Sequence, residues 1–67
     1  MSRPVNDKNF DMVSTLYHAS QGVQLSLQFS QDAKENSDQD AQAFFDRVAK
    51  HYQEIADEAR KLLKQKL

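Results

Sequence analysis

The chain has 67 residues, nine of them Lys or Arg and ten Asp or Glu, so its formal net charge is −1. This length allows one domain at most, and the absence of Cys excludes disulfides and thiolate metal sites. The charge balance gives no basic surface for nucleic acid, and no apolar run is long enough to cross a membrane. The N-terminal residues lack the apolar core of a signal peptide, so we expect a cytoplasmic protein.

The scarcity of turn residues favours an all-α fold. One Gly and one Pro in the whole chain supply too little turn chemistry for a sheet. Residues 1–7 are expected to form a flexible leader and residues 8–67 a helical hairpin, because Pro4 lies just before the helical pattern begins.

The first helix is expected to span residues 8–34. Its main stripe is weak, because small and hydroxylic residues interrupt it; its members are Met12, Val13, Leu16, Ala19, Ser20, Val23, Leu27 and Ser30. On another side, His18, Leu25 and Phe29 lie within about 40° of one another. Gly22 lies beside them in mid-helix, where close packing of a neighbouring helix would explain it. The helix is thus apolar on more than one side, which suits a helix with more than one partner.

The break between the helices is the polar run from Lys34 to Asp38. Asn36 is expected to take the left-handed conformation that ends a helix. Ser37 and Asp40 resemble a capping box, with Asp in place of the usual Glu. So short a link makes the two helices antiparallel neighbours.

The second helix is expected to span residues 38–66 and to carry the stronger stripe. That stripe consists of Ala41, Phe44, Phe45, Val48, Ala49, Tyr52, Ile55, Ala56, Ala59, Leu62 and Leu63. It is wider than a two-helix seam, so we expect the antiparallel two-helix hairpin to dimerise into a four-helix bundle.

The residues expected at the dimer or partner interface are apolar members of both helices, namely Leu25, Phe29, Phe44, Phe45, Val48, Tyr52, Ile55 and Leu62. Leu16, Val23 and Leu27 are expected opposite the residues of the second helix. Leu25 and Phe29 form either a second dimer seam, a patch for an unidentified protein partner, or isolated exposed side chains without a role.

His51, Glu54 and Glu58 are the candidate metal ligands. A His and a carboxylate three residues apart can hold a metal in a helical bundle, but here their order is reversed and the first helix lacks facing carboxylates. His18 is a further candidate ligand across the dimer. No nucleophile–base arrangement or glycine-rich phosphate loop is present, so we expect no enzyme activity and no cofactor.

The runs 16–24, 32–33 and 43–48 together resemble short bacterial helical-hairpin proteins that are similar to half of a ferritin-like four-helix bundle. The resemblance covers residues 9–67 and implies a dimeric four-helix arrangement without implying iron chemistry. We therefore expect a homodimeric structural or protein-interaction module that binds neither nucleic acid nor membrane. The alternative is a minimal or degenerate ferritin-like metal-binding protein.

Overall fold

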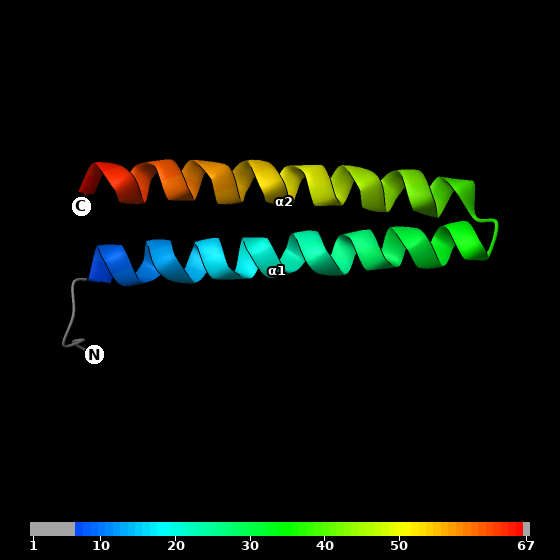
Figure 1. Ribbon diagram of the computed structural model, residues 1–67, viewed down its shortest axis with the longest axis horizontal. Coiled ribbons are helices and arrows are strands. Elements are labelled where there is room, and N and C mark those ends of the chain that lie inside the picture. Colours follow the sequence, from blue (N-terminus) through cyan, green and yellow to red (C-terminus); the bar gives the residue numbers. More distant parts are fainter. Residues whose placement is uncertain (1–6, 67) are drawn as a thin grey trace.

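Two long helices side by side make up the part of the chain that the computed structural model describes, which is the backbone of residues 7–66 and the side chains of residues 9–65. Helix α1 spans Asp7–Glu35 and helix α2 spans Gln39–Lys66, and they run antiparallel along their whole length (Figure 1). This confirms the predicted all-α hairpin. The first helix extends one residue further at each end than predicted, and the second begins one residue later. Apart from Asp7, the predicted leader lies outside the described residues.

The turn between the helices differs from the prediction by one residue. Ser37, rather than Asn36, is left-handed, with φ of 59°. The amide of Asp38 donates to the carbonyl of Ala33 at 2.9 Å, and the amide of Ser37 donates to the carbonyl of Lys34 at 3.1 Å. These two bonds form a Schellman motif, which satisfies the last free carbonyls of α1.

Asp38 also begins the second helix. Its carboxylate accepts a hydrogen bond from the amide of Ala41 at 3.1 Å, and its carbonyl accepts one from the amide of Gln42 at 3.0 Å. Asp38 is therefore the N-cap of α2, and the predicted pair of Ser37 and Asp40 does not form the cap. One residue thus completes the end of α1 and caps the start of α2, which explains why so short a link suffices.

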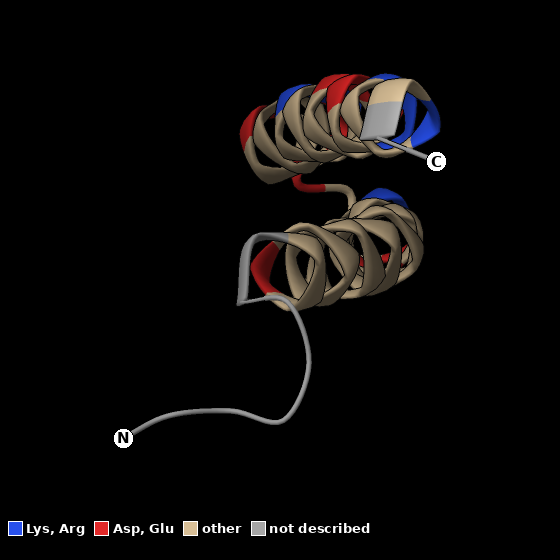
Figure 2. Cartoon of the chain, turned by 90° about the vertical axis from the view of Figure 1, so that its left-hand side faces the viewer, with Lys and Arg blue, Asp and Glu red and all other residues tan. Residues whose placement is uncertain are grey.

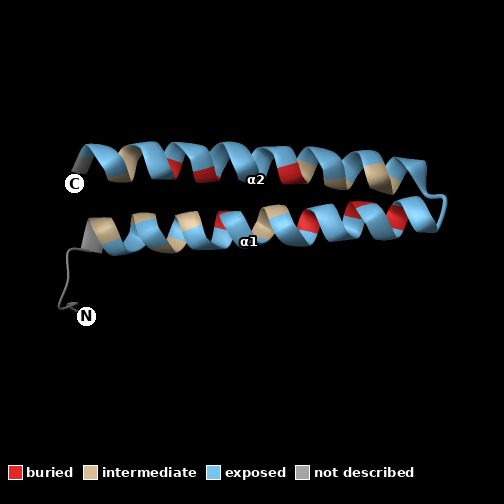
Figure 3. Ribbon diagram, viewed as in Figure 1, coloured by how far each residue is buried: buried red, intermediate tan, exposed pale blue. Residues whose placement is uncertain are grey.

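Small side chains fill the contact between the two helices. We call this contact the small-residue seam; it consists of Ala19, Ser26, Ser30 and Ala33 of α1 and Ala49, Ala56 and Ala59 of α2, each between 1% and 7% exposed. Within it, Ala19, Ser26 and Ala33 recur every seven residues, as do Ala49 and Ala56. A seven-residue spacing keeps each row facing the partner helix along its length. The buried positions lie on the facing sides of the two ribbons (Figure 3).

A hydrogen bond between the side chains of Ser30 and Asp46 crosses the seam. The Ser30 hydroxyl donates to the Asp46 carboxylate at 2.5 Å. A short bond to an ionised acceptor is among the stronger hydrogen bonds in proteins. Among the described residues, no buried side-chain nitrogen or oxygen lacks a partner. The seam therefore contains serines without leaving polar atoms unsatisfied.

Neither helix, over the described residues, has the combination of length and apolar character that a membrane span requires.

Candidate interaction surface

Several large apolar side chains lie outside the seam and collect on one broad side of the hairpin, while Phe10, Val13, Tyr17 and Leu27 are exposed on other parts of α1. We call this side the aromatic face; it consists of Leu25 and Phe29 of α1 and Phe44, Phe45, Val48, Tyr52 and Ile55 of α2, arranged around Gly22. Its five most prominent side chains, Leu25, Phe29, Phe44, Tyr52 and Ile55, are between 38% and 50% exposed. The hairpin thus buries small residues and exposes large ones, the reverse of an ordinary core.

Gly22 determines how close the helices come at the centre of this face. A Cβ atom at this position would lie 2.7 Å from both Cγ and Cδ2 of the Tyr52 ring and 2.8 Å from Cδ1. Ordinary contacts between carbon atoms are about 3.5–4.0 Å. The Tyr52 ring therefore occupies the space that any other residue at position 22 would need, which supports the expectation that close packing accounts for this glycine.

Three aromatic rings, those of Phe29, Phe44 and Phe45, pack against one another in the half of the aromatic face nearest the turn. Phe45 lies at the centre, with its ring centroid 5.4 Å from that of Phe29 and 5.1 Å from that of Phe44. Both pairs are edge-to-face, at interplanar angles of 61° and 72°. Edge-to-face contacts are a favourable geometry for aromatic rings, so the half-buried Phe45 holds the exposed Phe29 and Phe44 rings in place.

The predicted interface residues of the two helices therefore share one surface. Leu25 and Phe29 line the same groove, of about 290 Å³, as Phe44 and Tyr52. Leu62, the remaining predicted interface residue, is half-buried. It lies 18 residues beyond Phe44, or about five full helical turns, so its side chain points from the same side of α2 as that of Phe44. The separate second seam considered for Leu25 and Phe29 is instead continuous with the apolar stripe of α2.

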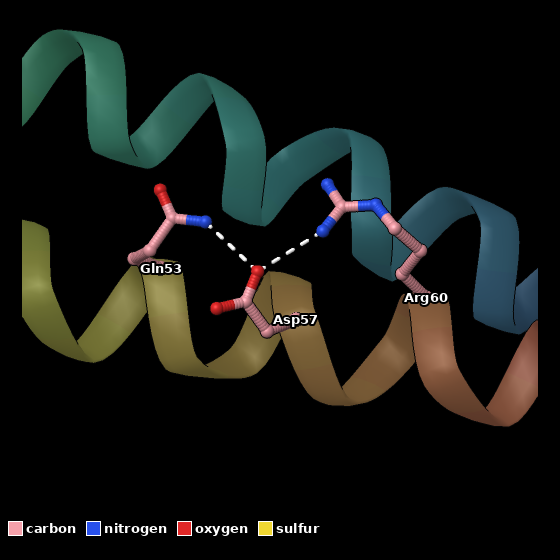
Figure 4. A network of polar contacts seen from close by, with 3 residues as sticks. All are labelled: Gln53, Asp57 and Arg60. Atoms are coloured by element: carbon pink, nitrogen blue, oxygen red, sulfur yellow. Dashed lines mark hydrogen bonds and ion pairs between the residues drawn. The ribbon is translucent and has the colours of Figure 1, made fainter.

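The other broad side of the hairpin is polar on α2. There, the Asp57 carboxylate accepts hydrogen bonds from Gln53 and from Arg60, each at 3.0 Å, so one oxygen joins three consecutive turns (Figure 4). Leu27, on the α1 part of this side, is 51% exposed and lies about 160° around α1 from Leu25. Leu27 therefore cannot share the aromatic face with Leu25, contrary to the expectation that it lies opposite the aromatic residues of α2.

Charge is distributed unequally between the helices. Residues 12–31 of α1 contain no Lys, Arg, Asp or Glu, whereas both signs recur throughout α2. Figure 2 shows this contrast, with α1 uncoloured by charge over most of its length. A helix without charged groups on any side over five turns is suited to contact with more than one neighbour.

The candidate metal ligands do not come together in a site. His51, Glu54 and Glu58 are all exposed on α2. In the region that the structure describes, no group of three or more His, Asp or Glu side chains is placed to hold a metal ion. His18 lines a groove of about 500 Å³ on the aromatic face together with Thr15 and Ile55.

Sequence reasoning missed two residues that line this groove, Thr15 and Gln21. Both residues lie within about 60° of His18 around α1. Helical geometry could therefore have assigned them to the same side of the helix as His18.

In comparisons with known proteins, no family model matches the chain, and neither a curated protein nor a solved structure matches it.

Proposed function

We propose that this protein is a structural or protein-interaction module that works as a homodimer, in which two hairpins pack through their aromatic faces into a four-helix bundle. The observation that carries this proposal is the placement of the large apolar side chains. Among the described residues, five of the nine exposed large apolar side chains gather on this one side and stay 38–50% exposed, while Ala and Ser fill the buried seam. A contiguous exposed apolar surface of this kind is typical of a protein–protein interface. We assign the protein no catalytic activity and no cofactor.

The broad side of the hairpin that carries the aromatic face is large enough for a dimer interface. The 29 residues of α1 span about 43 Å, and two helices of about 10 Å diameter give this whole side an area of roughly 800 Å². About 800 Å² per partner is the area of a standard protein–protein interface. Aromatic side chains at the centre of this area match the composition of interface cores.

A second copy of the chain fits this surface because the face presents both projections and grooves. Leu25, Phe29 and Phe44 project from it, and grooves of about 290 and 500 Å³ lie between them and along the neighbouring turns. A two-fold interface requires such a self-complementary patch. The other broad side of α2 instead holds the charged Asp57 and Arg60, whose burial would be costly.

A matched pair of variants tests this proposal. Leu25 and Leu27 are two residues apart in α1, and they are 48% and 51% exposed, but only Leu25 belongs to the aromatic face. Sedimentation of the wild-type chain at micromolar concentration should give twice the mass of 7.7 kDa. Leu25→Glu should give the monomer mass or lose helical signal, because the interface would bury an unpaired charge. Leu27→Glu should sediment as the wild type does.

Two results would contradict the proposal. A wild-type chain that sediments as a folded 7.7 kDa monomer would exclude the dimer. A dimer weakened equally by Leu27→Glu and Leu25→Glu would show that the aromatic face is not its interface. Circular dichroism of each variant at the same concentration distinguishes a folded monomer from an unfolded chain.

A further inference from the structure

We propose that a cavity beside the turn is a binding site for a lysine side chain of another protein. We call it the turn cavity; it has a volume of about 360 Å³, and its lining includes Phe29, Phe45, Ala33, Asp32, Asn36 and Asp38. This inference adds a partner of defined chemistry to the proposed interaction module and does not depend on the homodimer. The juxtaposition that carries it is that of apolar walls with two carboxylates to which the described hairpin supplies no cation.

The walls of the turn cavity are apolar. The rings of Phe29 and Phe45 lie edge-to-face with their centroids 5.4 Å apart, and the buried Ala33 lines the cavity with them. The alkyl stem of a lysine packs along apolar surface of this kind while its ammonium group stays in contact with water. An ammonium group close to the face of an aromatic ring is also attracted by the electrons of the ring. The walls therefore suit the stem of a lysine side chain.

Three polar side chains supply oxygen atoms to the same cavity. Asp32 belongs to the end of α1, and Asn36 and Asp38 belong to the turn. One carboxylate oxygen of Asp38 accepts a hydrogen bond from the amide of Ala41 at 3.1 Å, and its other oxygen has no partner among the described residues. An ammonium group has three N–H donors and no acceptor, so oxygen atoms are the partners it requires. The polar side of the cavity therefore suits the head of a lysine side chain.

No Lys or Arg side chain of the described hairpin forms an ion pair with Asp32 or Asp38. Lys34, the nearest basic residue in the chain, lies about 160° from Asp32 around α1. Residues 31–46 contain five acidic residues and one basic residue, a net charge of −4, whereas the rest of the chain contains five acidic and eight basic residues, a net charge of +3. The turn end of the hairpin therefore attracts cations, and a lysine from outside supplies the missing charge.

The proposed homodimer brings none of the described lysines to this cavity. Lys34 lies about 140° around α1 from Phe29, and the described lysines of α2 lie about 120–180° around that helix from Ile55; they are Lys50, Lys61 and Lys64. All four thus point away from the aromatic face that a second copy would cover. The lysine that fits the cavity therefore comes from a different protein.

A side chain held by a protein fits this cavity better than a free amine does. Asp32, Asn36 and Asp38 are all exposed, and ion pairs at exposed positions are individually weak. A lysine on a partner protein is one contact among several, so this contact alone does not have to offset the loss of translational freedom on binding. Three separate oxygen-bearing side chains also suit the compact ammonium group better than a planar guanidinium, which prefers to bind one carboxylate through two parallel hydrogen bonds.

An NMR titration with a short peptide tests the site. The probe is a single lysine between glycines, with both ends of the peptide blocked. It should shift the backbone amide signals of Ala33, Asn36 and Ala41 with a dissociation constant in the millimolar range, as exposed ion pairs imply. Ala41 is a direct reporter because its amide bonds to the Asp38 carboxylate, whereas the signal of Ala59, toward the other end of α2, should not move.

Two altered peptides test the chemistry of the ligand. Acetylation of the lysine removes its charge and should abolish the shifts. The same peptide with arginine in place of lysine should bind less tightly. Equal shifts with the acetylated peptide would show that the charge does not matter, and tighter binding of the arginine peptide would overturn the assignment to lysine.

Replacing the carboxylates one at a time tests the residues of the site. Asp32→Asn and Asp38→Asn should each raise the dissociation constant of the lysine peptide about fivefold, and the double variant should abolish the shifts. Asn caps a helix as well as Asp does, so Asp38→Asn keeps the start of α2. Asp40→Asn makes the same change of charge outside the lining of the turn cavity. At physiological ionic strength it should change the dissociation constant by less than about twofold.

The remaining outcomes would overturn the inference. No shift at any concentration at which the lysine peptide stays in solution would exclude the site. Equal effects of Asp40→Asn and Asp32→Asn would show a general attraction of cations to the acidic end instead of a bound lysine.

Sedimentation of the same samples separates this inference from the proposed homodimer. A dimer that does not respond to the lysine peptide would overturn the lysine site and leave the homodimer standing, and a 7.7 kDa monomer that responds would do the opposite. If Asp32→Asn or Asp38→Asn dissociated the dimer, the cavity would belong to a basic residue of the second copy, and the partner proposed here would be wrong.

Discussion

Replacing Gly22 by Ala should destabilise the hairpin, although Ala is the better helix former. A Cβ atom at position 22 would lie 2.7 Å from two atoms of the Tyr52 ring, so the ring would have to move by close to 1 Å. The near end of the ring, Cγ, is among the clashing atoms, and its position is set by the first side-chain torsion. The ring must therefore turn away from α1, or the helices must separate.

The size of the effect follows from the burial of Tyr52. Its side chain is 38% exposed. Losing the remaining burial of roughly 60% of an aromatic side chain of about 150–250 Å² would cost about 2–4 kcal/mol at about 25 cal/mol/Å². The higher helix propensity of Ala returns about 1 kcal/mol. We therefore expect Gly22→Ala to lower the free energy of unfolding by about 1–3 kcal/mol.

A double-mutant cycle isolates the contact. Without the ring, in the Tyr52→Ala background, Gly22→Ala should instead stabilise the chain by about 1 kcal/mol, which makes the coupling between the two sites about 2–4 kcal/mol. Urea unfolding followed by circular dichroism, with all variants at one protomer concentration, measures both terms. Ala43→Gly, at an exposed position in α2, measures the difference in helix propensity between Ala and Gly where no ring is in contact. If Gly22→Ala stabilises both backgrounds equally, the reasoning about the ring is refuted.

Two further substitutions test the turn and the seam. Ser37→Gly should raise the urea midpoint, with a gain of about 0.5–1 kcal/mol, because Gly adopts the observed φ of 59° without the steric cost that Ser bears. An unchanged or lower midpoint would contradict the left-handed assignment. Ser30→Ala should cost about 1 kcal/mol in the same assay, because it removes the bond to Asp46 across the seam. Ser20→Ala, at an exposed site in the same helix, is the control and should cost nothing; equal effects would show that the bond does not contribute.

The helices themselves could be predicted from the sequence because their signals are local. A single Gly, a single Pro and sustained three-to-four periodicity leave few alternatives to a hairpin. The turn was less predictable, since Asn36, Ser37 and Asp38 all belong to residue types that occur at helix ends. The hydrogen bonds of Asp38 to both helices decide among them, and those bonds depend on where the two helices lie in space.

The side of α1 that packs against α2 was predicted wrongly. The buried residues of the seam lie about 60° around the helix axis from the centre of the predicted stripe. Weighting by apolar character placed the stripe toward Val13 and Leu27, which are 53% and 51% exposed in the structure. Ser26 and Ala33, which are buried, were not in that stripe. Their seven-residue spacing from Ala19 could have identified the seam from the sequence. This row of small residues marks where the two helices lie close together, not where α1 is most hydrophobic.

The aromatic face required the structure because it joins residues from both helices. Each helix taken alone shows where Leu25 or Phe44 points relative to its own axis. Only the rotation of α1 about α2 shows that the two directions coincide, and the contact of Gly22 with Tyr52 fixes that rotation. The continuity of the interface residues is thus a property of the packed pair.

The division between small buried and large exposed residues links folding to association. A buried Ala removes one methyl group from water, whereas full burial of a Leu, Ile or Phe side chain is worth about 1.5–3 kcal/mol. In the hairpin the seam is built of Ala and Ser, and Leu25, Phe44 and Ile55 keep close to half of their surface exposed. Much of the hydrophobic free energy available to this chain is therefore released only when the aromatic face is covered. For that reason we expect thermal stability to rise with protomer concentration, and a melting temperature independent of concentration would contradict the proposed dimer.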